Sequence, residues 1–362
     1  MKVLLFIESA GIGGAERMVL EMLSLLRGQG VDASFLGVRK GWLTDELKKR
    51  QIPVNFVETA DKLSFHFKIA KVVKDSGADL VNSHSLDTNF HTALAAKVGG
   101  FKHLATEHGD VHHSDKRRNL ESKLKVLKFL GTEFNAVSEF SKSKLSTMGI
   151  AAKKISTIAN PVNLNIEDHS QHRDQVRAEL GISKEDWLWI HVANLRPVKD
   201  QHTLIKGFAE SFKTNKEQAL AIAGDGDLRP ELESLAKELG VDKQVHFLGF
   251  TQDAPKYLAA SDGFILSSLS EAMPMSLLEA AAMRLVLVGS SVGGIPEVIN
   301  KDTGYLFEAK NYKELAERLN QIVLDRDEAK QKAENSFMLT KSTYSAESIA
   351  TSYLERYKEI LC

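Results

Sequence analysis

The sequence predicts an α/β protein built from two doubly wound domains, and three observations support this. Strand-like and helix-like segments alternate through residues 1–163. A polar stretch, residues 164–185, then interrupts the pattern, and the alternation starts again after it. Because alternating β and α units form parallel sheets covered by helices on both faces, we expect two such sheets, with ligands at the carboxyl ends of their strands.

The first domain is expected to open with the strand KVLLFIE at 2–8, followed by the glycine turn SAGIGGAE. Helical apolar spacing and a terminal glycine then predict the helix RMVLEMLSLLRGQG. The later strands are DASFLGV, VNFVE, ADLVNSH, HLATEHG, NAVS and KISTIAN, and the later helices are TDELKKRQ, FHFKIAKVVKDSG and TNFHTALAAKVGG.

The linker 164–185 is expected to carry one short helix. After it the predicted strands are LWIHVANL, QALAIAG, QVHFLGF and GFILSS, and the predicted helices are HTLIKGFAESF, PELESLAKELG and APKYLAAS. The chain is expected to end in helices near 311–324, 326–338 and 345–361.

Composition restricts the function classes. The 362 residues are 43% hydrophobic and 26% charged with a net charge of -1, which gives no global basis for nucleic-acid binding. The single cysteine, Cys362, allows no internal disulfide, so a reducing compartment such as the cytoplasm is expected. No apolar run approaches the roughly 18 residues of a membrane span.

Residues 267–300 contain the most informative stretch. Glu271 and Glu279 have seven residues between them, and Pro274 among these is placed to begin a helix. Glu271 is therefore expected in a loop, and Glu279 in the second helical turn. The free N–H groups of about 275–277 would lie between the two carboxylates, where a helix start attracts phosphate. This layout suits an elongated phosphate ligand with hydroxyls at both ends, such as a nucleotide sugar.

Other polar residues follow strands of the second domain. Arg196 and Lys199 come after its first strand and could hold a diphosphate, although exposed basic residues are common in loops. Asp225 follows the next strand. Phe250 and Thr251 end the strand after that, where a base could stack or meet backbone groups.

The glycine turn allows two interpretations. Gly13 and Gly14 precede a helix, so a ligand could approach the backbone closely there. A plain tight turn is the alternative. A dinucleotide site is disfavoured, because Glu16 occupies a position where the fingerprint needs glycine and the second strand ends at 38–40 without an acid.

His108 ends the strand HLATEHG and could bond a substrate hydroxyl near neutral pH, or it could be an ordinary histidine. A metal site with Asp110, His112 and His113 is disfavoured, since Gly109 and the strand-to-loop context argue against one helical face. No metal is expected.

Residues 115–130, DKRRNLESKLKVLKFL, form a basic amphipathic pattern. It indicates either contact with an anionic membrane surface or lipid-phosphate acceptor, or a solvated helix whose apolar side packs in the core.

Together these motifs resemble the retaining glycosyltransferases of family 4, which have the GT-B fold of two Rossmann-like domains facing a cleft. Nine segments carry the resemblance in order: GGAER, ATEHG, NAVSE, IANPVN, NLRPVK, AGDGDLR, SEAMPMSLLEA, VGGIPEVI and TGYLF. The GGAER version resembles the bacterial subgroup that builds surface polysaccharides and lipid-linked oligosaccharides.

The resemblance implies roles for individual residues. Glu279 would bind the ribose of the donor nucleotide, and Glu271 would contact the transferred sugar. The implied catalytic group is His108, Arg196, Lys199 and Glu271. The implied donor-binding group is Gly13, Gly14, Asn194, Phe250, Thr251, Met275, Ser276 and Glu279. No metal or cofactor would be needed, since Arg196, Lys199 and the helix start would neutralise the leaving diphosphate.

Several positions depart from the family pattern. Asn194 stands where arginine is usual, which weakens the assignment of Arg196 relative to Lys199. Arg284 and Val286 replace a usual glycine and proline after the helix. Asn163 replaces the usual aspartate.

The expected activity is hexosyl transfer from a UDP- or GDP-linked sugar to a glycan or lipid-linked hydroxyl acceptor. The enzyme would be cytoplasmic or peripheral on the inner face of the cytoplasmic membrane. The rival interpretations are a nucleotide-sugar hydrolase or epimerase of the same fold, and a non-catalytic nucleotide-sugar-binding protein. The expected domains are an acceptor domain at 1–163, a donor domain at 164–345, and a helix at 346–362 that crosses back to the first.

Overall fold

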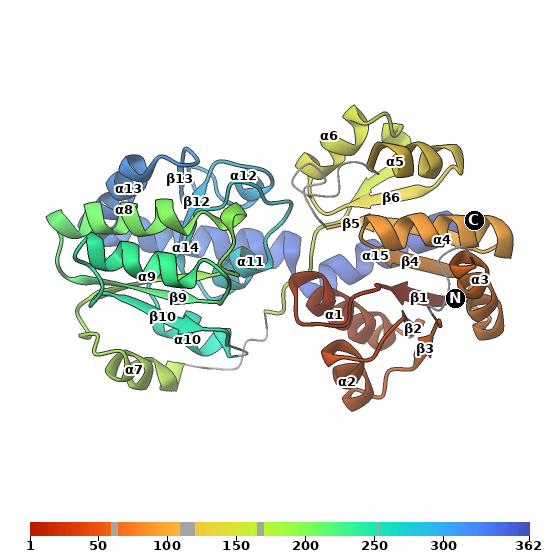
Figure 1. The fold of residues 1–362 in the computed structure, drawn as a ribbon, viewed down its shortest axis with the longest axis horizontal. Helices are drawn as coiled ribbons and strands as arrows, with labels where there is room; N and C mark the ends of the chain where they lie inside the picture. Colours follow the sequence, from red (N-terminus) through yellow and green to blue (C-terminus); the bar gives the residue numbers. More distant parts are fainter. Residues whose placement is uncertain (59–63, 109–119, 165–169, 252) are drawn as a thin grey trace. The chain divides into compact units, whose positions relative to one another are not determined.

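A computed structural model describes residues 1–58, 64–108, 120–164, 170–251 and 253–362. The chain forms two compact units (Figure 1). Residues 1–161 and 344–362 make up the first unit, and residues 162–343 make up the second. Both contain a parallel sheet flanked by helices, as the sequence predicts.

The first unit contains a seven-stranded parallel sheet in the order β3-β2-β1-β4-β5-β6-β7. Its strands are β1 (Lys2–Phe6), β2 (Asp32–Gly37), β3 (Val54–Phe56), β4 (Leu80–His84), β5 (Lys102–Glu107), β6 (Glu133–Ala136) and β7 (Ile155–Thr157). Its helices are α1 (Gly14–Gly28), α2 (Trp42–Lys49), α3 (Phe65–Ser76), α4 (Leu86–Gly99), α5 (Leu120–Phe129), α6 (Glu139–Thr147), the 3₁₀ turn η2 (Ala152–Lys154) and α15 (Ala346–Leu361).

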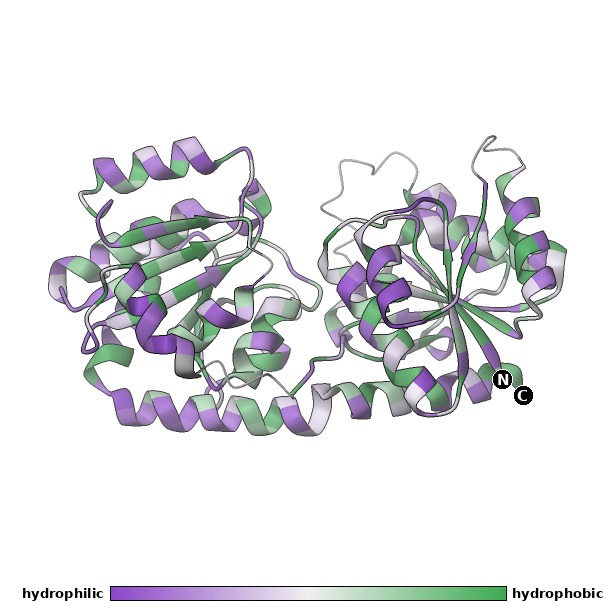
Figure 2. Ribbon diagram, turned by 90° about the horizontal axis from the view of Figure 1, so that it is seen from below, coloured by the Kyte–Doolittle hydropathy of each residue, from purple (hydrophilic) through white to green (hydrophobic). Residues whose placement is uncertain are grey.

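Burial on both faces explains the apolar run of β1. Val3 and Leu5 belong to the core cluster under α1 and α15, whereas Leu4 and Phe6 belong to the cluster under α3. Successive side chains of a strand point to opposite faces, so a strand covered on both sides is apolar throughout. Hydrophobic strands accordingly lie inside each unit, with hydrophilic stretches on the surrounding helices (Figure 2).

Helix α6 was not predicted, although two parallel strands, β6 and β7, need a crossover between them. Its sequence is mostly polar and buries only Ser141 and Leu145, so it gives no clear apolar stripe. The signal that could have located it is Ser138, whose Oγ accepts a hydrogen bond from the Ser141 N–H as an N-cap.

The second unit contains a six-stranded parallel sheet in the order β10-β9-β8-β11-β12-β13. Its strands are β8 (Trp187–Val192), β9 (Gln218–Ala223), β10 (Val245–Gly249), β11 (Gly263–Leu266), β12 (Val286–Ser290) and β13 (Tyr305–Phe307). Its helices are α7 (Ser170–Glu179), η3 (Pro197–Lys199), α8 (Gln201–Thr214), α9 (Arg229–Glu238), α10 (Ala254–Ala260), α11 (Met275–Ala282), α12 (Ile295–Val298), α13 (Tyr312–Leu324) and α14 (Arg326–Leu339).

The strand order of each sheet reverses once, between β1 and β4 in the first unit and between β8 and β11 in the second. In open α/β sheets, such a reversal leaves a crevice outside the carboxyl ends of the two strands, where ligands bind. Ligand-binding residues are therefore expected in the loops that follow these four strands.

Helix α15 returns to the first unit after the chain has completed the second. A π-helical segment, Thr340–Tyr344, joins it to α14. Its Tyr353 and Tyr357 are buried and bonded to side chains of the sheet: Asn135 Nδ2 donates to the Tyr353 hydroxyl at 3.0 Å, and Asn82 Nδ2 donates to that of Tyr357 at 2.8 Å.

Candidate functional site

In the second unit, the loop after β8 carries the predicted cations. Asn194 and Arg196 are exposed, and Lys199 is partly buried at the end of the 3₁₀ turn η3. Asp200 then takes a left-handed conformation, with φ of 47°, and caps α8 by accepting from the Thr203 N–H. This sharp turn directs the chain from β8 into α8 and fixes the backbone of Lys199.

Lys199 and Glu271 form an ion pair at the carboxyl ends of β8 and β11, with 2.5 Å between Nζ and Oε1. The Ser268 hydroxyl donates to the same Oε1 at 2.6 Å. Both bonds thus reach one carboxylate oxygen, and Oε2 has no hydrogen bond to a described residue. The Ser267 hydroxyl also donates to the Lys199 carbonyl at 2.8 Å, which ties the two loops together.

The loop after β12 fixes the backbone of Glu271. The Gly294 N–H donates to the Glu271 carbonyl at 3.0 Å. Gly293 has φ of 59°, and a Cβ placed on it would lie 1.8 Å from that carbonyl oxygen. Only glycine fits this position, because both the backbone conformation and the close approach exclude a side chain.

Helix α11 begins as predicted, with Pro274 at the N-cap and Met275 and Ser276 as its first two residues. The Leu277 N–H donates to the Pro274 carbonyl at 3.2 Å, so the amides of Met275 and Ser276 are the open donors at the helix start within the described chain. Glu279 lies in the second turn and is partly buried. Glu271, the helix start and Glu279 therefore have the predicted order along one segment.

A second glycine loop supports the turn after β8. Ideal Cβ atoms on Gly224 and Gly226 would lie 1.9 Å from the Ala193 carbonyl oxygen and 2.4 Å from that of Leu195. Asp225 accepts a bond from the Gly226 N–H and pairs with Arg229 at 3.6 Å, so its carboxylate stabilises this loop.

Phe250 and Thr251 follow β10 at the same edge of the sheet. The side chain of Phe250 is 54% exposed, which leaves an aromatic face for stacking. The Thr251 hydroxyl accepts from the Asp253 N–H at 3.0 Å.

In the first unit, Gly13 is the N-cap of α1 and Gly14 its first residue. Glu16 in the first turn is 9% exposed, and its Oε2 would lie 2.4 Å from a Cβ on Gly13. The Glu16 carboxylate thus packs over the glycine turn, at the position where a dinucleotide site would need a third glycine. This contact supports the exclusion of that site.

His108 directly follows β5, and its Nε2 lies 2.8 Å from Nδ1 of His84 at the end of β4. The rings stack with centroids 5.0 Å apart. Burial lowers the pKa of His108 to about 4, and burial followed by the charge of His108 lowers the pKa of His84 well below 6.5. Both rings are therefore neutral near pH 7, one donating and the other accepting. His84 was missed because a histidine at the end of a strand is unremarkable until its neighbour in the sheet is known.

Glu107, beside His108, is a buried carboxyl group that sequence reasoning also missed. Burial raises its pKa from 4.5 to about 8, and the nearby charge of Asp87 adds to the rise. The Asn89 amide donates to Glu107 Oε1 at 3.2 Å and opposes the shift.

The predicted residues thus gather at two sheet edges. Lys199 and Glu271 are in contact, with Asn194, Arg196 and the start of α11 on neighbouring segments. In the first unit, Gly13 and Gly14 lie at the start of α1, and His108 directly follows β5. Asp110, His112, His113 and residues 115–119 of the basic helix lie outside the described residues.

The described part of the basic helix, α5, turns its apolar residues inward. Leu120, Leu124 and Leu127 are buried in the core of the first unit, and Lys123 pairs with Asp87. This part of the apolar stripe therefore belongs to the protein core. Within the described residues, no helix is long and apolar enough to cross a bilayer.

Two family models match the chain. One, described as Glycosyltransferase Family 4, matches residues 12–166, and the other, Glycosyl transferases group 1, matches residues 172–337. Between them they take in Gly13, Gly14, His108 and the cluster around Glu271.

Characterised relatives are similar over most of their length. An N-acetyl-alpha-D-glucosaminyl L-malate synthase of Bacillus anthracis is 29% identical over 83% of this chain and 79% of its own. A UDP-Gal:alpha-D-GlcNAc-diphosphoundecaprenol alpha-1,3-galactosyltransferase of Escherichia coli is 24% identical over 87% of this chain and 86% of its own.

Solved structures share the fold. Anabaena Alr3699/HepE in complex with UDP-glucose superimposes with a TM-score of 0.87 at 22% identity, covering 99% of this chain and 100% of that one. A Rickettsia africae glycosyltransferase superimposes with a TM-score of 0.88 at 23% identity, covering 99% of this chain and 98% of that one. The chain therefore belongs to the family-4 type of glycosyltransferases, and its two Rossmann-like units have the GT-B fold.

Proposed function

We propose that this glycosyltransferase moves a hexose from a nucleoside diphosphate to a hydroxyl group of a glycan or lipid-linked acceptor, with retention of anomeric configuration. The observation that carries the proposal is the cluster of Lys199, Glu271 and the start of α11. It combines a cation, a carboxylate with one oxygen left for a ligand, and two open backbone donors.

The cluster suits the charge changes of the reaction. As the glycosidic bond of the donor breaks, negative charge develops on the diphosphate. Lys199, exposed Arg196 and the amides of Met275 and Ser276 can stabilise that charge without a metal ion. Because the pair with Lys199 uses Oε1 of Glu271, its Oε2 can accept a bond from a sugar hydroxyl.

The same edge of the sheet also carries protein groups that complement the ribose and the base of the donor. Glu279, one turn into α11, would accept bonds from the ribose hydroxyls, and the exposed ring of Phe250 would stack on the base. Thr251 lies beside it. UDP is the first nucleotide to test, because the HepE structures hold UDP and UDP-glucose.

The acceptor class is proposed from the relatives. The Escherichia coli relative transfers galactose to a diphosphoundecaprenol-linked sugar, and a Campylobacter jejuni relative is similarly named for a diphospho-undecaprenol acceptor. We propose a lipid-linked acceptor of this type and a peripheral place on the inner face of the cytoplasmic membrane. The Bacillus anthracis relative, whose acceptor is malate, makes a small anionic acceptor the alternative to include in a screen.

The test uses Lys199→Ala and Glu279→Ala with a panel of UDP- and GDP-sugars. Each variant is expected to weaken nucleotide binding, measured by calorimetry, and to lower transfer at least about tenfold without changing the unfolding temperature. Lys206→Ala and Glu238→Ala, at exposed positions of the same unit, are the matched controls.

Product analysis distinguishes a glycosyltransferase from the rival interpretations, a nucleotide-sugar hydrolase and a non-catalytic binding protein. A hydrolase would release free sugar even without an acceptor, and a binding protein would bind nucleotide with no turnover on any acceptor. NMR of the first product gives its anomeric configuration; an inverted product would overturn retention, and wild-type transfer by both variants would overturn the residue roles.

A further inference from the structure

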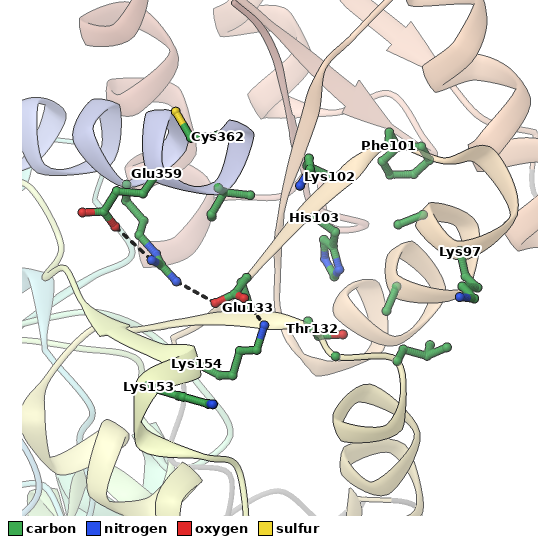
Figure 3. Close-up of a pocket in the computed structure, with 16 residues that line it drawn as sticks. Lys97, Phe101, Lys102, His103, Thr132, Glu133, Lys153, Lys154, Glu359 and Cys362 are labelled. Atoms are coloured by element: carbon green, nitrogen blue, oxygen red, sulfur yellow. Dashed lines mark hydrogen bonds and ion pairs between the residues drawn. The ribbon is translucent and has the colours of Figure 1, made fainter.

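The first unit contains a cavity of about 710 Å³. It is lined by the end of α4, the start of β5, the turn before β6, η2 and the end of α15 (Figure 3). These segments surround the amino ends of β5 and β6, whereas His108 follows the carboxyl end of β5. The cavity and His108 therefore lie at opposite edges of the sheet.

Basic side chains dominate the charged lining: Lys97, Lys102, Lys153, Lys154 and Arg356. Lys154 and Arg356 share Glu133, and Arg356 also pairs with Glu359 at 2.9 Å. The other three lysines have no ion pair within the described part of the chain. They leave an excess of positive charge that favours an anionic ligand.

His103 adds a directional group to this lining. It is 8% exposed, and Figure 3 shows its ring projecting from β5 toward the cavity. Its Nε2 lies 2.7 Å from the Ser83 hydroxyl, which donates its only proton to Asn89 Oδ1 at 2.7 Å. The Asn89 orientation is fixed because its Nδ2 donates to the carbonyl of Thr106 and to Glu107.

The protonation of His103 follows from this chain of bonds. Since the Ser83 proton is committed to Asn89, His103 Nε2 must carry the proton that reaches Ser83. Burial lowers the pKa of His103 to about 3, so its Nδ1 holds a lone pair near pH 7. That nitrogen is buried and bonds no described residue. His103 Nδ1 can therefore accept a hydrogen bond from a hydroxyl group of a ligand.

Arg356 supplies the complementary donor. In its guanidinium group, Nη1 donates a hydrogen bond to Glu359 and Nη2 donates one to Glu133. The third nitrogen, Nε, is buried and bonds no described residue. The lining thus offers one buried acceptor, one buried donor and three unpaired ammonium groups. Unmatched buried polar atoms are uncommon in proteins and call for a partner.

We propose that this cavity is a binding site for a small phosphorylated polyol, whose phosphate contacts Lys97, Lys102 and Lys153 and whose hydroxyl donates to His103 Nδ1. The volume lies within the usual range for small-molecule sites, roughly 300–1,000 Å³. The site is independent of the donor cluster, so its test does not depend on the transfer reaction.

The test is calorimetric titration of the purified full-length protein with glycerol 3-phosphate and ribose 5-phosphate. Binding with a dissociation constant of about 1 mM or lower is expected. Lys102→Ala combined with Lys153→Ala should weaken it at least about tenfold. The matched control is Lys71→Ala with Lys74→Ala, two exposed lysines of α3 in the same unit.

Ligand and site controls make the result decisive. Methyl phosphate, which has no alcohol hydroxyl, should bind several-fold more weakly than glycerol 3-phosphate. Lys199→Ala should leave binding intact, which separates this cavity from the proposed donor site. Binding of glycerol 3-phosphate that survives the Lys102 and Lys153 double variant, or that is lost in Lys199→Ala, would overturn the proposal. Absence of binding both in this titration and in the vesicle experiment described next would overturn it as well.

The same chemistry occurs in a lipid headgroup, so a second arm uses phosphatidylglycerol vesicles. Vesicle binding that falls in the double variant, with no binding of glycerol 3-phosphate, assigns the cavity to a headgroup. Titration by glycerol 3-phosphate assigns it to a soluble ligand.

Discussion

At the scale of single residues, burial decides the protonation of Glu107 and with it a pH dependence of stability. Its pKa in the folded chain is about 8, against an ordinary 4.5, because the carboxyl group is buried next to Asp87. Its contribution to stability is therefore fully present below about pH 4.5. It is lost as the pH rises toward 8, because the unfolded chain releases a proton that the folded chain retains.

Glu107→Gln should remove this dependence. Glutamine stays neutral and can accept the same bond from Asn89. We expect wild-type stability, measured by urea unfolding from pH 5 to 8, to fall with a slope of up to about 1.4 kcal/mol per pH unit relative to the variant. Glu355→Gln, at an exposed position of α15, should parallel the wild type. Parallel curves for wild type and Glu107→Gln would contradict the prediction.

Residue-level prediction from sequence succeeded where the partners lie close in the chain. Glu271 in a loop, Pro274 at the helix start and Glu279 one turn later follow from local rules. The ion pair between Lys199 and Glu271 joins residues 72 apart. It depends on β8 and β11 being neighbours in the sheet, which no local pattern specifies.

At the scale of elements, helix α5 presents a basic outer face. Lys125 and Lys128 are exposed, and Phe129 at its end is 89% exposed, while its leucines are buried. The sequence predicted the amphipathic pattern but left both interpretations open, since a core-facing and a membrane-facing stripe have the same period. Burial of the leucines means that, within α5, a membrane contact would have to use exposed residues such as Lys125, Lys128 and Phe129.

Lys125→Glu combined with Lys128→Glu tests that contact. We expect sedimentation with anionic vesicles at low salt to fall at least about fivefold, because each basic residue near an anionic surface contributes on the order of 1 kcal/mol. Lys71→Ala with Lys74→Ala again serves as a control. Equal binding of the wild type to neutral vesicles, or no effect of salt, would indicate a solvated helix face instead.

At the scale of the whole molecule, alternation of strands and helices was enough to predict two parallel sheets, and the polar stretch 164–185 located the change between them. The strand orders were not predictable, because alternation is the same whichever neighbour a strand pairs with. Nor did the sequence show how α15 binds: its tyrosines bond Asn82 and Asn135, two polar residues inside apolar strands.

Residues 1–161 alone should not fold stably. Helix α15 contributes five buried residues to the main core of the first unit: Ile349, Ala350, Tyr353, Tyr357 and Ile360. Burying a large apolar side chain contributes about 1.5–3 kcal/mol, so their sum is comparable to a typical stability of about 5–15 kcal/mol. Circular dichroism should show no cooperative melting for 1–161, and cooperative melting when a flexible linker joins 161 to 344. A stable fragment 1–161 would contradict this.

The return of α15 also sets an order of events during synthesis. The second unit, 162–343, is encoded as an uninterrupted segment, so all of its strands can leave the ribosome and pair before α15 has been made. The first unit, although translated first, must wait for the last residues to complete its core. In the cell, the nascent first unit therefore spends the translation time of about 180 residues, some 10–40 s, with the hydrophobic surface that α15 later covers still open to chaperones.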